Sequence, residues 1–128
     1  MPRLTRIIMV DDDPDILAVA RLALEALGGF TVVTCASGSD AVQTAPAFAP
    51  DIILLDVTMP EMDGPSTLKA LRAIPQTAVT PVIFVTARVQ PHEMAQYRAL
   101  GALDVIAKPF DPMTLSATIR SIWARRYH

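Results

Sequence analysis

The sequence of 128 residues holds a single cysteine, Cys35, and only two lysines, Lys69 and Lys108. One cysteine excludes an internal disulfide, which leads us to expect a protein of the reducing cytoplasm. Since lysine is so scarce, a lysine at the end of a strand is less easily explained as surface decoration. No apolar stretch approaches the ~20 residues that a membrane span requires. The short apolar run after Arg6 stops at aspartates, unlike a signal peptide, so we expect no membrane partner.

The chain also lacks a large excess of charge, since its formal net charge is -2. It shows no basic stripe and no separate helix-turn-helix pattern, and we therefore expect no direct contact with nucleic acid. Internal repeats, low-complexity tracts and flexible linkers are absent as well. Hydrophobic residues make up 52% of the chain, which is enough for a sizeable core. These features predict one domain over residues 1–128.

Short apolar runs alternate with amphipathic stretches along the whole chain. We expect strands over 6–10, 31–35, 51–55, 81–85 and 103–107. We expect helices over 14–27, 37–48, 64–73 and 91–100, and a last helix from near Pro112. This alternation predicts a parallel sheet covered on both faces, in a three-layer αβα arrangement. About five strands favour the flavodoxin-like, doubly wound (βα)5 fold with strand order 2-1-3-4-5.

The ends and inner faces of two helices can be predicted in more detail. Asp13 has the position of an N-cap for the first helix, with Pro14 at the first helical position. The glycines that follow residue 27 should end this helix. The residues spaced to face the core are Ile16, Ala20, Leu24 and Leu27 in the first helix, and Leu115, Ile119 and Ile122 in the last.

Charged residues stand where three of the apolar runs end. Asp11 and Asp12 follow the first strand, Asp56 follows the third, and Lys108 follows the fifth. Strands one and three are neighbours in the predicted order, so their carboxyl ends bring the three carboxylates into one crevice. The ends of strands four and five add Thr86 and Lys108. Ligands of open α/β sheets bind at this place.

The residue types in this crevice suit phosphoryl chemistry. Crowded carboxylates repel one another unless a cation intervenes, and oxygen ligands favour Mg²⁺. Asp11 and Asp12 can hold such an ion, whereas Asp56 has a carboxylate oxygen to offer as a nucleophile. Lys108 supplies a point charge and Thr86 a hydroxyl donor for phosphoryl oxygens. The pattern predicts a metal-assisted phosphoryl-transfer site.

Four short motifs give the chain a resemblance to a known family. They are Val10-Asp11-Asp12-Asp13, Asp56-Val57-Thr58-Met59-Pro60-Glu61-Met62-Asp63-Gly64, Val85-Thr86-Ala87 and Lys108-Pro109-Phe110. Their order and spacing over essentially the whole chain resemble the response-regulator receiver domain of bacterial two-component signalling. Each motif alone is a weak signal, but four in register are specific.

The resemblance implies a role for each matching residue. Asp56 would be the phospho-acceptor, and Asp11 and Asp12 would be the acidic pair that binds Mg²⁺, together with Asp56 and the backbone carbonyl of Thr58. Thr86, beside Ala87, would be the switch hydroxyl. Lys108 would pair with Asp56 and later with the phosphate, and the bond between Lys108 and Pro109 would be cis.

One position departs from the family pattern. The switch of a receiver usually couples the threonine to an aromatic residue in the fifth strand, whereas this chain has Val105 there. Phosphorylation does not depend on that ring, but a readout gated by it cannot operate. By the same resemblance, Thr58 and Arg88 border the phosphoryl group and should influence its lifetime.

The resemblance predicts a signalling switch rather than an enzyme that acts on other molecules. A sensor histidine kinase or a histidine phosphotransfer protein would donate the phosphoryl group, and the receiver would support its own phosphotransfer and autodephosphorylation. The face made by 92–100, 103–105 and 112–123 would engage a downstream protein or an effector domain, and a homodimer is left open. The sequence stops soon after its last helix, which fits either a stand-alone receiver or one cut from a longer protein.

Two other hypotheses remain at this point. A haloacid-dehalogenase-type phosphatase would use Asp11 as nucleophile and Asp13 as general acid, but the chain is short for it, and Asp56 would have no role. A flavodoxin-like cofactor binder would need hydroxyls and glycines in the first loop to bind a phosphate. The aspartates found there would repel an anionic cofactor.

Overall fold

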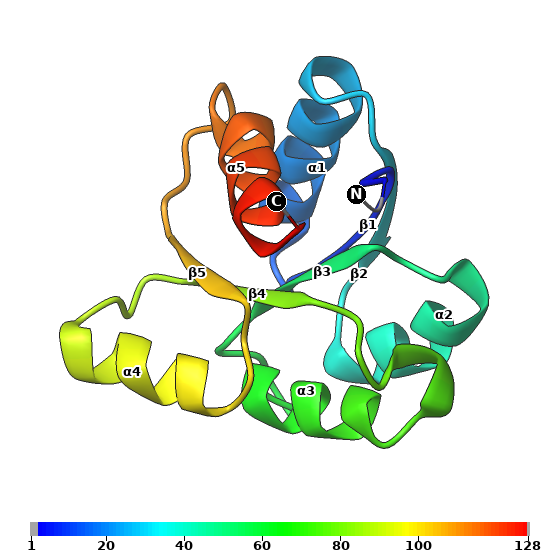
Figure 1. Cartoon of the computed structure of the whole chain (residues 1–128), viewed down its shortest axis with the longest axis vertical. Helices are drawn as coiled ribbons and strands as arrows, with labels where there is room; N and C mark the ends of the chain where they lie inside the picture. Colours follow the sequence, from blue (N-terminus) through cyan, green and yellow to red (C-terminus); the bar gives the residue numbers. More distant parts are fainter. Residues whose placement is uncertain (1–2, 128) are drawn as a thin grey trace.

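A computed structural model describes residues 3–127 as a parallel sheet between two layers of helices (Figure 1). The strands are β1 (Arg6–Val10), β2 (Thr31–Cys35), β3 (Ile52–Asp56), β4 (Val82–Thr86) and β5 (Asp104–Ala107). All four neighbouring pairs are parallel, and the order β2-β1-β3-β4-β5 confirms the predicted flavodoxin-like fold. The predicted starts of β3, β4 and β5 each fall one residue early.

Helices cover both faces of the sheet. They are α1 (Pro14–Leu22), α2 (Gly38–Phe48), α3 (Gly64–Arg72), α4 (Pro91–Ala99) and α5 (Leu115–Tyr127), with the short turns η1 (Ala23–Leu27) and η2 (Pro75–Thr77). Figure 1 shows α1 and α5 on one face and α2, α3 and α4 on the other. None of the helices in residues 3–127 is long and apolar enough to cross a membrane.

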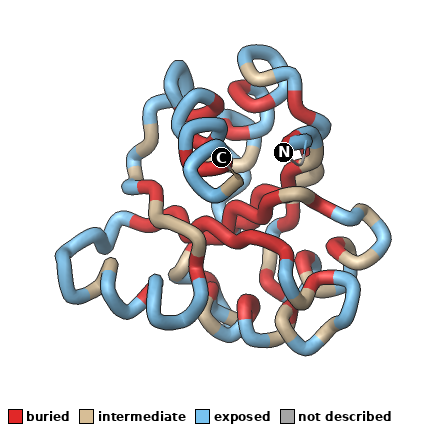
Figure 2. The backbone as a smooth tube through the Cα atoms, viewed as in Figure 1, coloured by how far each residue is buried: buried red, intermediate tan, exposed pale blue. Residues whose placement is uncertain are grey.

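The continuous apolar runs are explained by burial of the strands on both faces. Every residue of β3 and β4 is buried, and Figure 2 shows these strands as the buried centre of the molecule. Successive side chains of a strand point to opposite faces. Ile52 and Leu54 thus join the core under α1 and α5, whereas Ile53 and Leu55 join the core under α2, α3 and α4. A sheet with two cores has no place for an alternating polar face.

The first helix starts as predicted, and its helical turns end at Gly28 as predicted, but the last turn is of another type. Asp13 is its N-cap, and its side chain accepts a hydrogen bond from the N–H of Asp15. The α-helical turns stop at Leu22, and a π-helical turn follows over η1. The prediction that Leu27 faces the core is wrong, because it is 55% exposed. A π turn bonds i to i+5 and is wider than an α turn, so it rotates Leu27 away from the face that buries Ala20 and Leu24.

The last helix starts later than predicted. A hydrogen-bonded turn occupies residues 112–114, and α5 begins at Leu115 rather than near Pro112. The backbone carbonyl of Asp111 accepts from the N–H groups of Thr114 and Leu115 and so holds this turn. Burial of Leu115, Ile119 and Ile122 in the core is confirmed.

Candidate functional site

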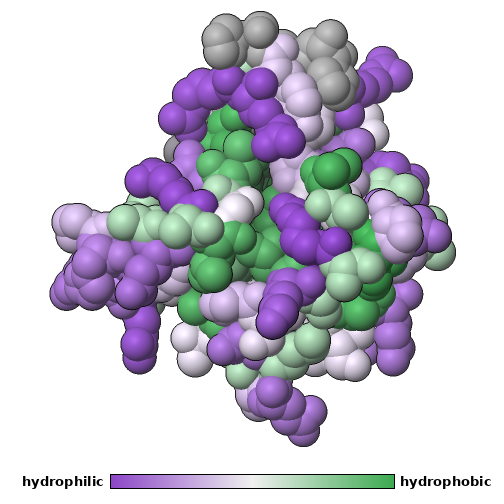
Figure 3. Space-filling model, turned by 60° about the horizontal axis from the view of Figure 1, so that its bottom comes forward, coloured by the Kyte–Doolittle hydropathy of each residue, from purple (hydrophilic) through white to green (hydrophobic). Residues whose placement is uncertain are grey.

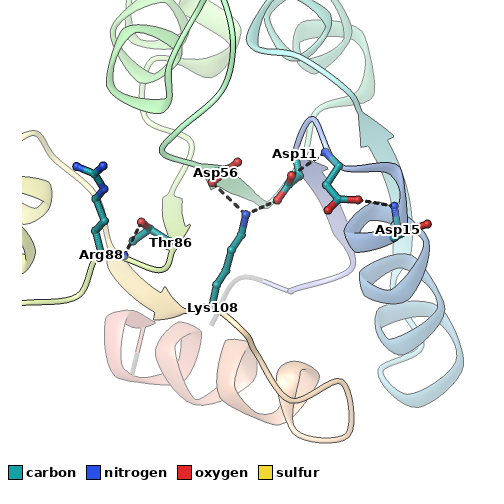
Figure 4. Close-up of polar contacts among 7 residues, drawn as sticks. Asp11, Asp15, Asp56, Thr86, Arg88 and Lys108 are labelled. Carbon is teal, nitrogen blue, oxygen red and sulfur yellow. Dashed lines mark hydrogen bonds and ion pairs between the residues drawn. The ribbon is translucent and has the colours of Figure 1, made fainter.

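The carboxyl ends of β1, β3 and β5 bring three charged side chains together (Figure 4). Asp11 directly follows β1, Asp56 is the last residue of β3, and Lys108 directly follows β5. The Lys108 ammonium lies 2.6 Å from Oδ2 of Asp11 and 3.1 Å from Oδ1 of Asp56. Asp11 is only 1% exposed and Asp56 only 5%. Two buried carboxylates therefore share one cation.

A third carboxylate completes an oxygen-rich corner. Asp11, Asp12 and Asp56 each offer an oxygen, and these oxygens lie within 4.8 Å of one another. Asp12 is exposed, so the corner opens to solvent on its side. Hard carboxylate oxygens with room for water match what Mg²⁺ prefers. The residues present therefore fit a magnesium ion.

The backbone fixes where Asp11 points. Its Oδ1 accepts from the N–H of Asp13 at 2.9 Å, and its own N–H donates to the carbonyl of Cys35 at 3.1 Å. Asp13 in turn caps α1. The three consecutive aspartates thus have different tasks. Asp11 is buried beside the lysine, Asp12 faces solvent at the acidic corner, and Asp13 starts the helix.

The electrostatics of the corner make Asp56 harder to ionise than an ordinary aspartate. Burial raises the pKa of Asp56 above its ordinary value, and the Asp11 carboxylate raises it further, while bonds from Lys108 and from the backbone of Thr58 offset only part of this. Burial alone would lower the pKa of Lys108, but its bonds to Asp11 and Asp56 outweigh that effect and raise it. A further cation in the corner would favour the ionised form of Asp56.

The loop after Asp56 is closed by Gly64, the first residue of α3. The Gly64 N–H donates to the carbonyl of Val57 at 2.8 Å. A Cβ at this position would lie 2.5 Å from the carbonyl oxygen of Asp56 and 2.8 Å from Cα of Val57. Only glycine allows this approach of α3 to the strand end. The sequence Asp63-Gly64-Pro65 indicates a helix start, because Asp63 is the N-cap of α3 and Pro65 lies in its first turn.

Thr86 ends β4, the neighbour of β3, and is 3% exposed. Its hydroxyl oxygen accepts from the N–H of Arg88 at 3.0 Å, and its carbonyl accepts from the N–H of Lys108 at 2.8 Å. In this arrangement the hydroxyl is engaged with its own loop, as Figure 4 shows. Ala87 follows it and is exposed. Thr86 thus lies at the carboxyl end of the sheet, as predicted, on the strand next to the one that carries Asp56.

The fifth strand leads into an apolar hollow beside the lysine. The peptide bond between Lys108 and Pro109 is cis, and Val105 is half-buried against the core under α4. A cavity of about 380 Å³ lies next to the corner. It is lined by Asp15, Ile16, Val19, Ala87, Lys108, Pro109 and Phe110. The sequence did not predict this hollow, because α1 and the loop after β5 meet only in the folded chain.

Comparisons with known proteins agree with this geometry. The transcriptional regulatory protein PrrA of Mycobacterium tuberculosis is 37% identical over 94% of this chain and 51% of its own length. CpxR of Escherichia coli, also a transcriptional regulatory protein, is 40% identical over 98% of this chain and 51% of its own length. The chain thus spans about half the length of the curated relatives it matches.

Solved structures and a family profile point the same way. The chemotaxis response regulator CheY4 of Vibrio cholerae superposes with a TM-score of 0.86 at 32% identity, over 94% of this chain and 99% of that one. The family described as the response regulator receiver domain matches residues 7–120. The chain therefore belongs to the response-regulator receiver domain family of two-component systems.

Proposed function

We propose that Asp56 accepts a phosphoryl group in the presence of Mg²⁺ and that this event switches the domain between two states. The observation that supports the proposal most strongly is the placement of Asp56. Asp56 ends a fully buried strand beside Lys108 and Asp11. A buried carboxylate contributes little to the packing of the core there, so packing does not explain its presence. A buried carboxylate with a raised pKa in a polar crevice is typical of a functional site.

The transfer needs little beyond position and charge. An oxygen of Asp56 attacks the phosphorus of a phosphohistidine, the P–O bond forms, and the P–N bond breaks with its electron pair left on the imidazole nitrogen. Lys108 lies 3.1 Å from Asp56 and can then bind a phosphoryl oxygen. Magnesium held by Asp11, Asp12, Asp56 and the carbonyl of Thr58 would neutralise charge on the phosphoryl oxygens.

The charge added at Asp56 would be read through Thr86 and Lys108. Both belong to the edge of the sheet that Asp56 occupies, and the carbonyl of Thr86 already accepts from the backbone N–H of Lys108. A phosphoryl group offers acceptors that can draw the Thr86 hydroxyl away from Arg88. The loop between β4 and α4 would change with it. Water attack on the acyl phosphate, supported by the same site, would reset the switch.

The donor would be a sensor histidine kinase or a histidine phosphotransfer protein. The relatives PrrA and CpxR are transcriptional regulators, about twice the length of this chain. A receiver of this kind would control a downstream protein or an attached effector through the face of α4, β5 and α5, with dimerisation as one form of output. Nucleic acid would then be bound by the effector, and not by the receiver itself.

The phosphatase hypothesis is less well supported by the geometry. Asp11 is 1% exposed, and both of its oxygens are engaged, one with Lys108 and one with the N–H of Asp13. Asp13, the acid that this hypothesis requires, accepts a hydrogen bond as the cap of α1. Burial raises the pKa of Asp56, and the phosphatase hypothesis gives this residue no role.

Intact-mass measurement after incubation with Mg²⁺ and acetyl phosphate tests the proposal. We expect the wild type to gain one phosphoryl group that hydroxylamine removes, and we expect no gain for Asp56→Asn or in EDTA. Beryllofluoride binding with Mg²⁺ is measured in parallel, so that a short-lived adduct is not missed. An adduct that persists in Asp56→Asn, or the absence of both adduct and beryllofluoride binding in the wild type, would contradict the proposal.

A further inference from the structure

Helix α4 has one buried side chain and one ion pair to the sheet, from Arg98 to Asp104 of β5 at 3.6 Å. Tyr97 is its only buried residue, whereas α5 places four side chains in the hydrophobic core. The surface over α4, at the left of Figure 3, is predominantly hydrophilic, and Figure 2 shows nearly the whole helix as exposed or half-buried. Burial of apolar surface is the main force that holds a helix on a sheet, and an exposed ion pair adds little, so Tyr97 makes the main contact that positions α4.

The ring of Tyr97 packs on the strand that carries Thr86. It meets Phe84 edge-on, with ring centroids 5.4 Å apart and planes at 62°, and these side chains are 6% and 0% exposed. Phe84 precedes Thr86 by two residues on β4, so both side chains point to the same face of the sheet. Phe84 is also the β4 partner of Val105 on β5. Val105 stands where the family pattern has an aromatic residue. Tyr97 therefore packs on the strand neighbour of that position.

A short backbone path joins the same strand to α4. The N–H of Arg88 donates to the Thr86 hydroxyl at 3.0 Å. Gln90 is the N-cap of α4, in a capping box with Glu93. Residues 87–90 thus lie between the hydroxyl and the first turn of the helix. When the hydroxyl turns away from Arg88, this segment loses a bond that fixes it, and the helix is then held by the Tyr97 ring and the exposed Arg98–Asp104 pair.

We propose that Tyr97, seated on Phe84, is the residue through which phosphorylation of Asp56 is transmitted to α4 in this chain. The proposal rests on the proposed function and assigns to a ring on α4 the part that a ring on β5 would otherwise play. In the arrangement described, the Tyr97 ring holds α4 against the sheet while Thr86 bonds its own loop. When the Thr86 hydroxyl leaves Arg88, the equilibrium of α4 shifts from the position packed on the sheet toward a displaced one. Tyr97 is thus a positioning residue that acts through Phe84 and the β4–α4 segment.

Coupling between two sites is reciprocal. If the seated ring opposes the change that phosphorylation brings, removal of the ring lowers the cost of that change and strengthens binding of a phosphoryl analogue at Asp56. A tyrosine that only fills space would affect stability without affecting this affinity. The affinity for Mg²⁺–beryllofluoride therefore distinguishes the two roles, although Tyr97 does not belong to the charged corner.

The test compares the wild type with Tyr97→Ala, Tyr97→Phe and Tyr127→Ala. Beryllofluoride affinity is measured by fluorine NMR in Mg²⁺, and hydrogen exchange is followed in peptides that cover α4. We expect Tyr97→Ala to bind about fivefold more tightly, within the usual range of coupling between sites. We also expect its α4 to exchange without the analogue as it does in the wild type with the analogue. Tyr97→Phe keeps the ring, and Tyr127→Ala removes a ring from α5 instead, so both should match the wild type.

Three results would count against the inference in distinguishable ways. Unchanged affinity in Tyr97→Ala, with α4 exchange that still responds to the analogue, overturns it. The inference also fails if Tyr127→Ala tightens binding as much as Tyr97→Ala, because the effect would then reflect general loosening. No bound analogue in the wild type overturns the proposed function itself. If Tyr97→Ala does not fold, Tyr97→Leu keeps apolar volume without a ring and gives the same comparison.

Discussion

Strand β3 has an aspartate at each end, and the two are held in opposite ways. Asp51, just before the strand, accepts hydrogen bonds with one oxygen from the N–H groups of Thr5 and Arg6, at 2.9 and 2.8 Å, and from the Thr5 hydroxyl at 3.2 Å. Asp56, at the other end, has a lysine at 3.1 Å and a second carboxylate for a neighbour. Asp51 is held mainly by fixed backbone donors, whereas Asp56 shares its cation with the Asp11 carboxylate.

The cations at the two ends of the sheet also differ in how firmly their partners are fixed. At the amino end, the Arg6 guanidinium donates twice to the carbonyl of Phe48, at 2.8 and 2.6 Å, and lies 4.1 Å from the centre of its ring. At the carboxyl end, Lys108 is the cation, and it divides its bonds between Asp11 and Asp56. A carboxylate held by several fixed donors stabilises a fold, whereas one whose partner is shared can exchange that partner. The amino end of the sheet therefore serves stability and the carboxyl end serves change.

The largest expected effect is on the rate of phosphorylation, when the cation at each end of the sheet, Lys108 or Arg6, is replaced by methionine. Lys108→Met removes the charge that would stabilise the transferring phosphoryl group, and we expect phosphorylation by acetyl phosphate to slow by about 100-fold. Arg6→Met should leave that rate within about twofold, since its contacts are with Phe48 at the far end. It should instead lower the free energy of unfolding by about 1–2 kcal/mol. Equal rates for the two variants would break the comparison.

Next in size is the effect of a methyl group beside Asp56. Gly64→Ala places a Cβ against the carbonyl of Asp56, and either the loop or α3 has to shift. We expect it to lower the free energy of unfolding by about 1–3 kcal/mol and to slow phosphorylation, as measured by denaturant unfolding and intact mass. Gly101→Ala is the control, because its Cβ meets no atom within 4 Å although its φ of +101° strains an alanine. It should cost stability only, so a Gly101→Ala rate as slow as that of Gly64→Ala would contradict the assignment.

Loss of the fixed carboxylate should have a smaller effect, confined to stability. Asp51→Asn removes the charge that two backbone N–H groups share, and we expect a loss of about 1–2 kcal/mol in the free energy of unfolding. Phosphorylation should proceed at the wild-type rate, because Asp56 and Lys108 are at the opposite, carboxyl end of the sheet. A variant of normal stability would show that the amino-end carboxylate is not structural.

Much of this contrast could be predicted from the sequence, and the reason is local. A buried strand has no place for a charge, so the position of Asp56 at the end of an apolar run follows from the sequence alone. The strand order then followed from the alternation of elements. Asp13 as a cap was equally local, since a cap is fixed by the residues next to it. Such predictions depend on neighbours in the chain.

What could not be predicted depends on contacts between distant segments. The π turn that exposes Leu27 leaves no mark in the spacing of apolar residues. The packing of Tyr97 on Phe84 joins a helix to a strand through a geometry that no motif encodes. The close approach of Gly64 to the backbone of Asp56 is visible only when α3 is placed. Each of these concerns how elements meet, which periodicity alone does not determine.

The smallest predicted effect is a pH-dependent change in Tm, and its sign at neutral pH should differ between Asp56→Asn and Asp51→Asn. The folded-state pKa of Asp56 is raised above the ordinary value of 3.8. Below 3.8 the carboxyl is protonated in folded and unfolded chains alike, and as the pH rises through the raised pKa the folded state loses stability, because a buried group beside Asp11 has to ionise. Asp56→Asn escapes this loss. In EDTA at neutral pH its Tm should therefore exceed the wild-type Tm by a few degrees.

The gain in Asp56→Asn should shrink as the pH falls and vanish near the ordinary value of 3.8. Asp51→Asn, measured in the same series of thermal unfolding experiments, should melt below the wild type at neutral pH. Opposite signs for two identical substitutions at the ends of one strand would separate the carboxylate that stabilises the fold from the carboxylate that the fold tolerates. If Asp56→Asn instead melts below the wild type at neutral pH, the bond to Lys108 outweighs burial, and Asp56 belongs with Asp51 as a structural residue.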